Sequence, residues 1–544
     1  MPPERQKIGK SWIRVLLAGA LQALCFAPGP LPAWVLPFAQ IGALSVLAAH
    51  TWSAPSPWRA ALQGWIFGVA QFAIGVYWLV ISMHTYGGLA LPLAIVALLV
   101  FAATMALYGA AACALSAWLC SAWRTTRQHA SRQILNALIW ASSWTLFEWL
   151  RGTLFTGFTW LNIGYAHAEG VFSAWAPVVG VYGLAWLAAF SAAAVASMAR
   201  AKDSPPYNRS AAAVVVLALG FGLLGVLGTQ IDWVRPKGSP LLVRLVQPAT
   251  PQSEKFDPQL FGQILARGLN LAALPSEGES SHPSLIVLPE TVMPIFQDQV
   301  SAAVWREWQN VAQREQATIV MGVPLHTRTI TGERYTNSAI ALRPDDLKLP
   351  GSPGEWHYDK RHLVPFGEFI PPGLQWFVHA LRIPLGDFNR GPLIQAPLLL
   401  AGQVISVNIC YEDTFGEEIA ARVAPAVNGA PGASILLNLS NLAWFGNTWA
   451  LRQHLQMARM RALETARPVI RATNTGITAA IGLHGEIQAA LEPGSRGVLD
   501  VEVQGTQGLT PYVRWRNTPV LTWIALCLAA GLLRRKRTRL SSSR

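Results

Sequence analysis

Three reactive side chains each follow a stretch of sequence that is expected to form a buried strand. Glu290 lies in the string Leu-Pro-Glu-Thr, Lys360 in Tyr-Asp-Lys-Arg-His, and Cys410 in Asn-Ile-Cys-Tyr-Glu. In α/β enzymes, ligands and reactive groups commonly gather just past the ends of strands. The sequence therefore offers one carboxylate, one ammonium group and one thiol from three distant segments.

Each of these residues also has an ordinary structural explanation when it is taken alone. Cys410 could be a small core residue, Glu290 could cap a following helix, and Lys360 could be a solvated loop charge. As a set they suggest covalent catalysis, because a thiol with a pKa of about 8.5 needs a base or a cation to become a good nucleophile. Glu290 would take the proton, and Lys360 would stabilise the thiolate and the oxyanion that follows.

Cysteine usage favours a reactive thiol over a disulfide or a metal site. Cys410 lies outside the apolar runs of the chain, and the other four cysteines lie inside them: Cys25, Cys113, Cys120 and Cys527. A single thiol in an exported domain has no disulfide partner there. Zinc is the main alternative for Cys, Glu and His, but no paired ligand spacing supports it. We expect no metal ion and no organic cofactor.

The region that carries these residues, 232–517, alternates buried strands with amphipathic helices. Continuous runs rich in branched side chains predict strands at 241–247, 284–288, 317–323, 338–342, 404–409 and 433–439. Apolar side chains at three- and four-residue intervals predict helices at 258–273, 297–314 and 450–466. Segments 347–354 and 424–432 are dense in Pro and Gly, which indicates loops. The alternation predicts an α/β domain.

The chain as a whole is too apolar for an ordinary soluble enzyme. Of its 544 residues, 52% are hydrophobic and only 13% are charged. No charged residue lies between Arg14 and Arg59 or between Arg59 and Arg124, and each gap holds two helices of about 20 residues. Further apolar runs fill 133–150, 171–199, 210–231 and 518–533. We expect eight transmembrane helices, seven in residues 1–231 and the last in residues 518–544, which also hold a basic tail.

Basic residues gather in every second loop between these spans. Lys and Arg near the ends of spans favour the cytoplasmic side. The pattern places both termini in the cytoplasm and residues 232–517 on the outer side of the membrane. These loops and tails also account for the net charge of +13. A basic surface on a folded domain is not indicated, and nucleic acid is not expected as a partner.

Longer strings around the three reactive residues resemble the nitrilase superfamily. More narrowly, they resemble its membrane-embedded branch, the apolipoprotein N-acyltransferases. The likeness is carried by Lys-Arg-His-Leu-Val-Pro-Phe-Gly-Glu from Lys360, by the Ala-Trp-Phe-Gly loop at 441–446, and by segments 453–464, 471–476 and 508–512. It runs from the first span to the last, which makes it far more specific than three reactive residues alone.

The resemblance implies a nitrilase-like αββα sandwich for residues 232–517. It makes Glu290 the general base, Lys360 the oxyanion stabiliser and Cys410 the nucleophile. Glu368, Tyr411 and Glu412 match positions that support the site, although Glu368 could also form an ordinary loop salt bridge. Phe256, Trp444 and Phe445 match positions that bind substrate or cover its entrance. For Trp444 and Phe445, packing beneath the loop is an equally good interpretation.

The implied reaction moves an acyl chain from a membrane phospholipid to a diacylated apolipoprotein. The acceptor is the α-amino group of its N-terminal diacylglyceryl-cysteine, and the acyl group passes through a thioester on Cys410. The implied location is the bacterial inner membrane, with residues 232–517 in the periplasm. A membrane-tethered amidase that hydrolyses small amides with the same residues remains the main alternative. A transporter is disfavoured, because the first four spans contain no charged residue.

Two positions depart from the family pattern. Phe256 stands where the family usually has Trp, so no indole N–H is available there. Leu442 replaces an Asp in the loop at 441–446, which puts a polar contact from that loop in doubt.

Overall fold

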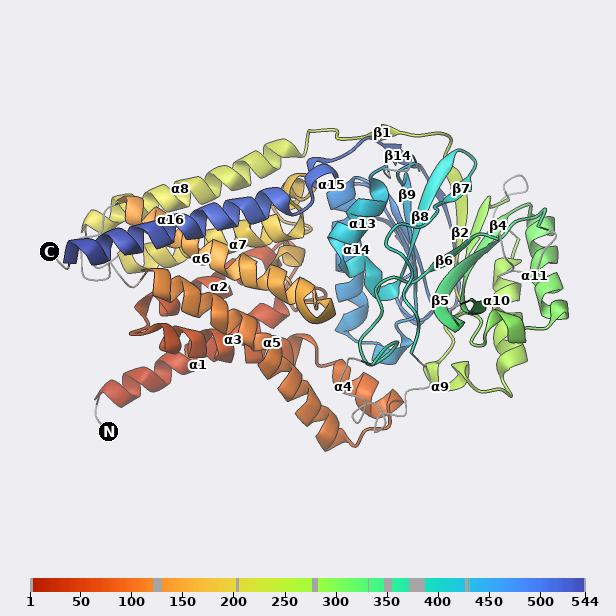
Figure 1. The fold of residues 1–544 in the computed structure, drawn as a ribbon, viewed down its shortest axis with the longest axis horizontal. Helices are drawn as coiled ribbons and strands as arrows, with labels where there is room; N and C mark the ends of the chain where they lie inside the picture. Colours follow the sequence, from red (N-terminus) through yellow and green to blue (C-terminus); the bar gives the residue numbers. More distant parts are fainter. Residues whose placement is uncertain are drawn as a thin grey trace. The chain divides into compact units, whose positions relative to one another are not determined.

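The computed structural model describes residues 3–120, 130–201, 205–275, 282–330, 332–346, 355–370, 387–425, 429 and 431–542. The chain divides into two compact units (Figure 1). The helical unit joins Met1–Tyr77, Pro92–Ile231 and Trp515–Arg544. The α/β unit joins Asp232–Arg514 with Trp78–Leu91, although this second segment lies between helices of the other unit in the sequence.

Every predicted span coincides with a long helix of the helical unit. These helices are α1 (Pro3–Leu24), α2 (Leu36–Ser53), α3 (Pro57–Gly75), α5 (Leu91–Cys120), α6 (Ala130–Thr153), α7 (Ala176–Ala201), α8 (Pro205–Gly228) and α16 (Thr518–Ser542). By length and composition, four helical segments among the described residues could cross a membrane: Leu91–Cys120, Ser173–Ala199, Ala211–Gly228 and Thr518–Thr538. A bent pair, Pro57–Gly75 with Leu79–Tyr86, makes five if it is one span.

The expected number of eight membrane-spanning helices is therefore not confirmed. Some helices fall short because they carry buried polar groups; α6, for instance, holds Ser142, Glu148 and Arg151. Arg151 donates hydrogen bonds to the carbonyl oxygens of Phe158 and Trp160, both at 2.7 Å. Such internally satisfied polar groups lower the hydropathy of a helix without exposing charge on its surface.

Small residues set the packing distance between helices in this unit. Gly19 of α1 lies against the backbone of Phe67 in α3, and Gly64 of α3 lies against the carbonyl of Gly109 in α5. A side chain at either glycine would meet backbone atoms, so only glycine permits this approach. Figure 1 shows α6, α7, α8 and α16 running side by side, and their contacts agree.

The α/β unit is built on two six-stranded sheets. The first has the order β13-β2-β3-β4-β5-β6 and the second β12-β11-β10-β9-β8-β7. Strands of the first are β2 (Leu241–Gln247), β3 (Leu285–Val287), β4 (Thr318–Thr329), β5 (Gly332–Leu342), β6 (His357–Asp359) and β13 (Gly497–Val503). Strands of the second are β7 (Leu398–Leu400), β8 (Gln403–Ile409), β9 (Ile435–Ser440), β10 (Val469–Thr473), β11 (Ala479–Ile481) and β12 (Ile487–Ala490). A two-stranded ribbon pairs β1 (Arg235–Pro236) with β14 (Thr506–Gln507).

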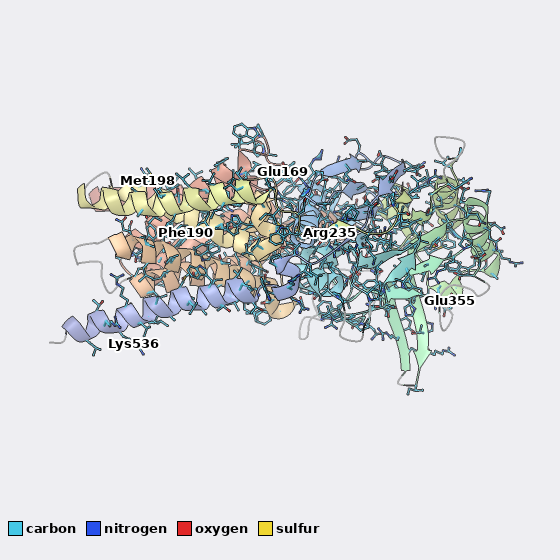
Figure 2. All side chains as sticks on the ribbon, turned by 90° about the horizontal axis from the view of Figure 1, so that it is seen from above. Glu169, Phe190, Met198, Arg235, Glu355 and Lys536 are labelled. Atoms are coloured by element: carbon cyan, nitrogen blue, oxygen red, sulfur yellow. The ribbon has the colours of Figure 1, made fainter. Side chains whose placement is uncertain are left out.

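Apolar side chains from both sheets form one core between them. Val243 and Leu245 of β2 belong to the same buried cluster as Ile405 and Val407 of β8. Helices α10 (Phe261–Ala272) and α11 (Ala302–Glu315) cover the outer face of the first sheet, while α13 (Gly416–Val423) and α14 (Trp449–Thr465) cover the second (Figure 1). Side chains fill the space between the layers (Figure 2). The expected αββα sandwich is confirmed.

Most of the strands that the sequence did not predict are very short, contain polar residues or lie at sheet edges. Strand β10 includes Arg471, a fully buried charge that interrupts an otherwise apolar run. Strands β12 and β13 are largely exposed or half-buried, so they lack the continuous apolar signal. The predicted loop at 347–354 and part of the one at 424–432 lie outside the described residues.

The parallel strands at the centre of each sheet bring distant segments to one edge. Strands β2, β3 and β4 run parallel, as do β8, β9 and β10. Glu290 follows β3, and Cys410 follows β8. Lys360 follows β6, which pairs antiparallel with β5. The predicted residues therefore come from both sheets.

Gly322 of β4 provides a test of how tightly the turn containing Glu290 is packed. A Cβ at Gly322 would lie 2.5 Å from the Thr291 nitrogen and 2.6 Å from the Glu290 Cα. We expect Gly322→Ala to lower the free energy of unfolding by about 1–3 kcal/mol, because backbone atoms must move. Thermal unfolding of the detergent-purified chain measures the loss. Gly497→Ala is the matched strand control, since nothing lies within 4 Å of its Cβ position; equal stability of the two variants would contradict the prediction.

Candidate active site

Glu290 is buried in the turn after β3, and three donors hold its carboxylate. Its Oε1 accepts hydrogen bonds from Lys360 Nζ at 3.0 Å and Asn337 Nδ2 at 2.8 Å. Its Oε2 accepts one from the backbone N–H of Asn441 at 2.9 Å. Burial alone would raise the pKa of Glu290, but Lys360, the Asn337 hydrogen bond and Lys255 together hold it below its ordinary value. Glu290 is therefore ionised at rest.

Lys360 lies between two carboxylates and is 1% exposed. Its Nζ donates to Glu290 Oε1 at 3.0 Å and to Glu368 Oε1 at 2.8 Å. Asn337 Nδ2 also donates to Glu368 Oε1, at 2.6 Å, so both carboxylates share the same two donors. Burial would lower the pKa of Lys360, but the negative charges of Glu290 and Glu368 raise it above its ordinary value. The ammonium group stays charged.

Cys410 begins a 3-10 turn, Cys410–Thr414, directly after β8. Its φ of 51° lies in the left-handed region, which is strained for a residue with a side chain. Burial raises the pKa of the Cys410 thiol well above its ordinary value, Glu290 adds to this, and Lys360 opposes it. Glu290 and Lys360 thus act in opposite directions on the pKa of the Cys410 thiol. At rest the site holds a neutral thiol beside an ionised carboxylate and an ammonium group.

The buried His454 forms a hydrogen bond with the backbone of Cys410. His454 Nδ1 lies 2.6 Å from Arg471 Nη2, and a guanidinium group can only donate. The ring hydrogen therefore sits on Nε2, which donates to the carbonyl oxygen of Cys410 at 3.2 Å. Asn438 Nδ2 donates to the same oxygen at 3.3 Å, and Asp413 Oδ1 lies 2.9 Å from His454 Nε2. These contacts hold the strained turn in place.

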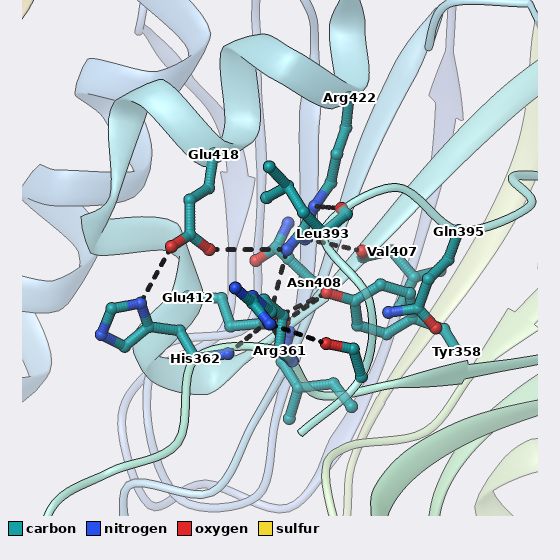
Figure 3. A network of polar contacts seen from close by, with 12 residues as sticks. Tyr358, Arg361, His362, Leu393, Gln395, Val407, Asn408, Glu412, Glu418 and Arg422 are labelled. Carbon is teal, nitrogen blue, oxygen red and sulfur yellow. Dashed lines mark hydrogen bonds and ion pairs between the residues drawn. The ribbon is translucent and has the colours of Figure 1, made fainter. Parts of the chain in front are cut away.

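Glu412 joins the segment after Lys360 to the turn that carries Cys410 (Figure 3). Its carboxylate is fully buried. Oε1 accepts from the backbone N–H groups of Arg361 at 2.7 Å and His362 at 3.1 Å, and Oε2 accepts from the N–H of Ile409 at 2.7 Å. One side chain therefore fixes two segments that carry reactive residues.

Two more side chains complete the network around Glu412. The Tyr358 hydroxyl donates to the carboxylate at 2.9 Å, and Arg422 Nη2 lies 3.3 Å from Oε1 (Figure 3). Arg422 also contacts Glu418 Oε2 at 3.8 Å. The buried negative charge of Glu412 is thus paired and fully hydrogen-bonded, which a buried carboxylate requires. Tyr411 is buried and packs edge-on against Phe415.

Two of the three residues expected to bind substrate or cover its entrance, Trp444 and Phe445, contact aromatic side chains from the segment 78–91, and the third, Phe256, contacts Trp444. Phe445 packs edge-on against Trp78 with ring centroids 4.5 Å apart, and Trp444 lies 6.1 Å from Tyr86. Phe256 lies 6.5 Å from Trp444. These rings are brought together from segments far apart in the sequence. All three predicted residues are half-buried.

In the loop where Leu442 departs from the family pattern, the polar contacts are made by its neighbour Asn441. Leu442 is buried in the core under α14. The neighbouring Asn441 supplies the polar contacts: its N–H donates to Glu290, and its Nδ2 donates to Gln252 Oε1 at 3.1 Å. Asn474 Nδ2 in turn donates to Asn441 Oδ1 at 3.1 Å.

Several residues at the site were not predicted from the sequence: Lys255, Asn337, Asn441, His454 and Arg471. A signal existed for some of them. Asn337 is a buried polar residue within a strand, and His454 and Arg471 lie in strings that carried the family resemblance. Within the described part of the chain, no group of three or more His, Cys, Asp or Glu side chains could hold a metal ion. A thiol, a carboxylate and an ammonium group in one buried site suit acyl transfer to and from the thiol.

Comparison with known proteins covers nearly the whole chain. Residues 18–194 match the family described as "Apolipoprotein N-acyltransferase N-terminal domain", and residues 242–512 match "Carbon-nitrogen hydrolase". A relative from Bordetella bronchiseptica named apolipoprotein N-acyltransferase is 50% identical and is aligned over 96% of each chain. A relative of that name from Ralstonia nicotianae is 42% identical over 96% of this chain and 93% of its own. A solved CN-hydrolase superfamily protein from Xanthomonas campestris is 20% identical, with a TM-score of 0.33, over 48% of this chain and 90% of its own.

Glu412 gives the prediction that follows from this geometry. Glu412→Ala leaves Arg422 and three backbone N–H groups without their buried acceptor, so we expect a loss of about 3–5 kcal/mol in unfolding free energy. Glu412→Gln keeps the shape and one acceptor oxygen, and should lose less. Thermal unfolding measures the loss of stability in each variant. The alkylation rate of Cys410 measures the effect on the turn that carries the thiol. Glu502→Ala, at an exposed position of β13, is the control. If Glu412→Ala has the same unfolding free energy as Glu502→Ala, the hydrogen bonds of Glu412 do not stabilise the protein and the prediction is wrong.

Proposed function

The chain belongs to the apolipoprotein N-acyltransferase family, and we propose that it acylates lipoproteins in two steps through a thioester on Cys410. The acyl donor is a membrane phospholipid. The acceptor is the α-amino group of the N-terminal diacylglyceryl-cysteine of an apolipoprotein. The observation that carries this proposal is the buried arrangement in which Lys360 bridges Glu290 and Glu368, while Glu412 ties the segment after Lys360 to the start of the turn that carries Cys410.

In the first step, Cys410 Sγ attacks an ester carbonyl of the phospholipid while Glu290 takes the thiol proton. Because the thiol is neutral at rest, proton transfer has to accompany the attack. The C–O double bond becomes an oxyanion, which the Lys360 ammonium group stabilises. The tetrahedral intermediate then breaks its ester C–O bond. The proton on Glu290 passes to the departing alkoxide, and a lysophospholipid and a thioester result.

In the second step, the free amine of the acceptor attacks the thioester carbonyl. Glu290 takes a proton from the attacking nitrogen, and the C–S bond breaks as the amide forms. The proton returns from Glu290 to Cys410 Sγ, which restores the resting site. Water must be kept away from the thioester between the two steps, since hydrolysis would waste the acyl group.

The remaining predicted residues have supporting roles in this proposal. Glu368 holds Lys360 against Glu290. Glu412 and Tyr411 set the position of the nucleophile turn. Phe256, Trp444 and Phe445 form an apolar cover where acyl chains enter, because aromatic side chains suit contact with lipid near a membrane surface.

We further propose that all eight long helices cross the bacterial inner membrane. The basic residues in alternate loops support cytoplasmic termini and a periplasmic α/β unit. Both substrates of the reaction are lipids, so a site at headgroup level would let their acyl chains remain in hydrocarbon while their carbonyl groups reach Cys410.

Labelled phospholipid tests the thioester directly. Purified protein given an acyl-labelled phospholipid should acquire label that hydroxylamine releases, and a diacylated lipopeptide added next should receive that label as an amide. Cys410→Ala should acquire none. Glu290→Gln should form the adduct at least about a hundredfold more slowly, because it lacks the base.

Two results would overturn this mechanism. One is lipopeptide acylation by Cys410→Ala at the rate of the unchanged protein. The other is release of small amides at full rate without lipid and with no transfer to lipopeptide, which would support the amidase alternative. Gly262→Ala, in the exposed part of α10 with nothing near its Cβ position, is the activity control.

Introduced cysteines test the proposed topology in spheroplasts, since the four native cysteines other than Cys410 are buried. In a Cys410→Ala background, a membrane-impermeant maleimide should label Gly262→Cys in the α/β unit without lysis, because that exposed position faces the periplasm. Arg59→Cys lies at an exposed position in the first turn of α3 and should react only after lysis, since that end of the helix is cytoplasmic in the proposed topology. Reversed accessibility of the two sites would show that the orientation is wrong.

A further inference from the structure

The residues assigned to the reaction leave the site with an unbalanced charge. Glu290 and Glu368 each carry a negative charge, and Lys360 alone carries a positive one. While the thiol is neutral, the sum is therefore one negative charge. Moving a proton from Cys410 to Glu290 leaves that sum unchanged but puts the charge on sulfur. A buried site with an excess negative charge disfavours both the thiolate and the oxyanion.

Lys255 is a second buried cation beside these groups. It is 3% exposed and ends the short helix α9 (Gln252–Lys255). Its Nζ donates to the backbone carbonyl oxygen of Glu290 at 3.2 Å. That is the one acceptor its ammonium group has among the described residues. An ammonium group has three hydrogens to donate, so Lys255 retains donors toward its surroundings.

The charges of the site act on Lys255, which shows that it belongs to the same electrostatic system. Burial lowers the pKa of Lys255 to about 8, while Glu290 and Cys410 both raise it. The effect is mutual, since Lys255 also lowers the pKa of Glu290. Lys255 is therefore mostly protonated near neutral pH and loses its charge just above it.

The position of Lys255 is fixed by contacts that also fix Glu290. Gln252, at the start of α9, accepts a hydrogen bond from Asn441 Nδ2 at 3.1 Å. Asn441 in turn donates its backbone N–H to Glu290. The helix is thus tied to the Glu290 carboxylate at one end and to the Glu290 carbonyl at the other. The ammonium group of Lys255 is therefore held against the Glu290 backbone, away from solvent.

Arg471 and Asp413, which lie behind Cys410, carry opposite charges 3.8 Å apart and cancel in this sum. We propose that Lys255 is the cation that joins Lys360 in the active site and balances Glu368, so that the thiolate and the oxyanion form at zero net charge. It acts on Cys410 through the electric field and through the position of Glu290. With Lys255 protonated, the groups sum to zero both before and after the proton moves from Sγ to Glu290. The inference rests on the proposed role of Cys410 as nucleophile.

Alkylation of Cys410 tests this without any acyl substrate, so its outcome is separate from that of the acyl-transfer assay. The full-length protein in detergent would be treated with iodoacetamide from about pH 6 to about pH 10, a range that brackets the pKa of Lys255. Mass spectrometry of the Cys410 peptide gives the rate. Lys255→Met should react about tenfold more slowly below pH 8, because an opposite charge nearby shifts a pKa by about one unit or more. The difference should shrink above pH 8, where Lys255 itself is neutral.

Lys255→Arg keeps the charge and should follow the unchanged protein below pH 8. Above pH 8, Cys410 of the Lys255→Arg variant should be alkylated faster than Cys410 of the unchanged protein, because arginine does not lose its proton there. Lys237→Met, which removes a charge from a half-buried lysine elsewhere in the same unit, should match the unchanged protein throughout. Thermal unfolding checks that each variant is folded, and Lys255→Gln replaces the Met variant if that one is not. A folded Lys255→Met or Lys255→Gln with an unchanged pH profile, or a Lys255→Arg as slow as the Met variant, would overturn the proposal.

Discussion

The structure of the site depends on one buried ammonium group held between two carboxylates. Lys360 Nζ contacts Glu290 at 3.0 Å and Glu368 at 2.8 Å, and the group is almost completely removed from solvent. Ions are costly to bury unless every donor and acceptor is matched. Asn337 and the backbone N–H groups of Asn441 and Val364 supply the remaining donors to these carboxylates. The backbone around the site must therefore place several hydrogen-bond donors close to the two carboxylates.

That requirement explains why the two sheets are stacked rather than separate. Glu290 and Asn337 come from the first sheet, Cys410 and Asn441 from the second, and the apolar core between the sheets aligns their edges. Glu412 adds a direct link, because its carboxylate binds N–H groups from both sides of the site. The energy of apolar burial thus fixes the sheets, and a small number of buried polar contacts fixes the reactive groups within them.

The sequence predicted the parts of this arrangement whose signal is local. Strand β2 spans the predicted residues, and Glu290, Lys360 and Cys410 could be proposed because their residue types suit one chemistry. Residues that act through distant contacts carried a weaker signal. Lys255 is one charge in an ordinary short helix, and Arg471 interrupts the strand to which it belongs, although its string carries the family resemblance. The number of membrane spans could not be settled by hydropathy either, since polar groups such as Glu148 and Arg151 satisfy each other inside the helical unit.

The segment 78–91 has a consequence for how the chain reaches its final state. Its Trp78 donates a buried hydrogen bond to Gln453, a residue 375 positions later. During synthesis this segment is made long before the strands of the two sheets. Its partner Gln453 is therefore absent until the helices that follow the segment have also been made. Contacts between such remote positions form slowly, because a long loop has to close first. Completion of the enzyme is thereby tied to the end of translation, and a chain that stops early leaves these aromatic side chains without their partners.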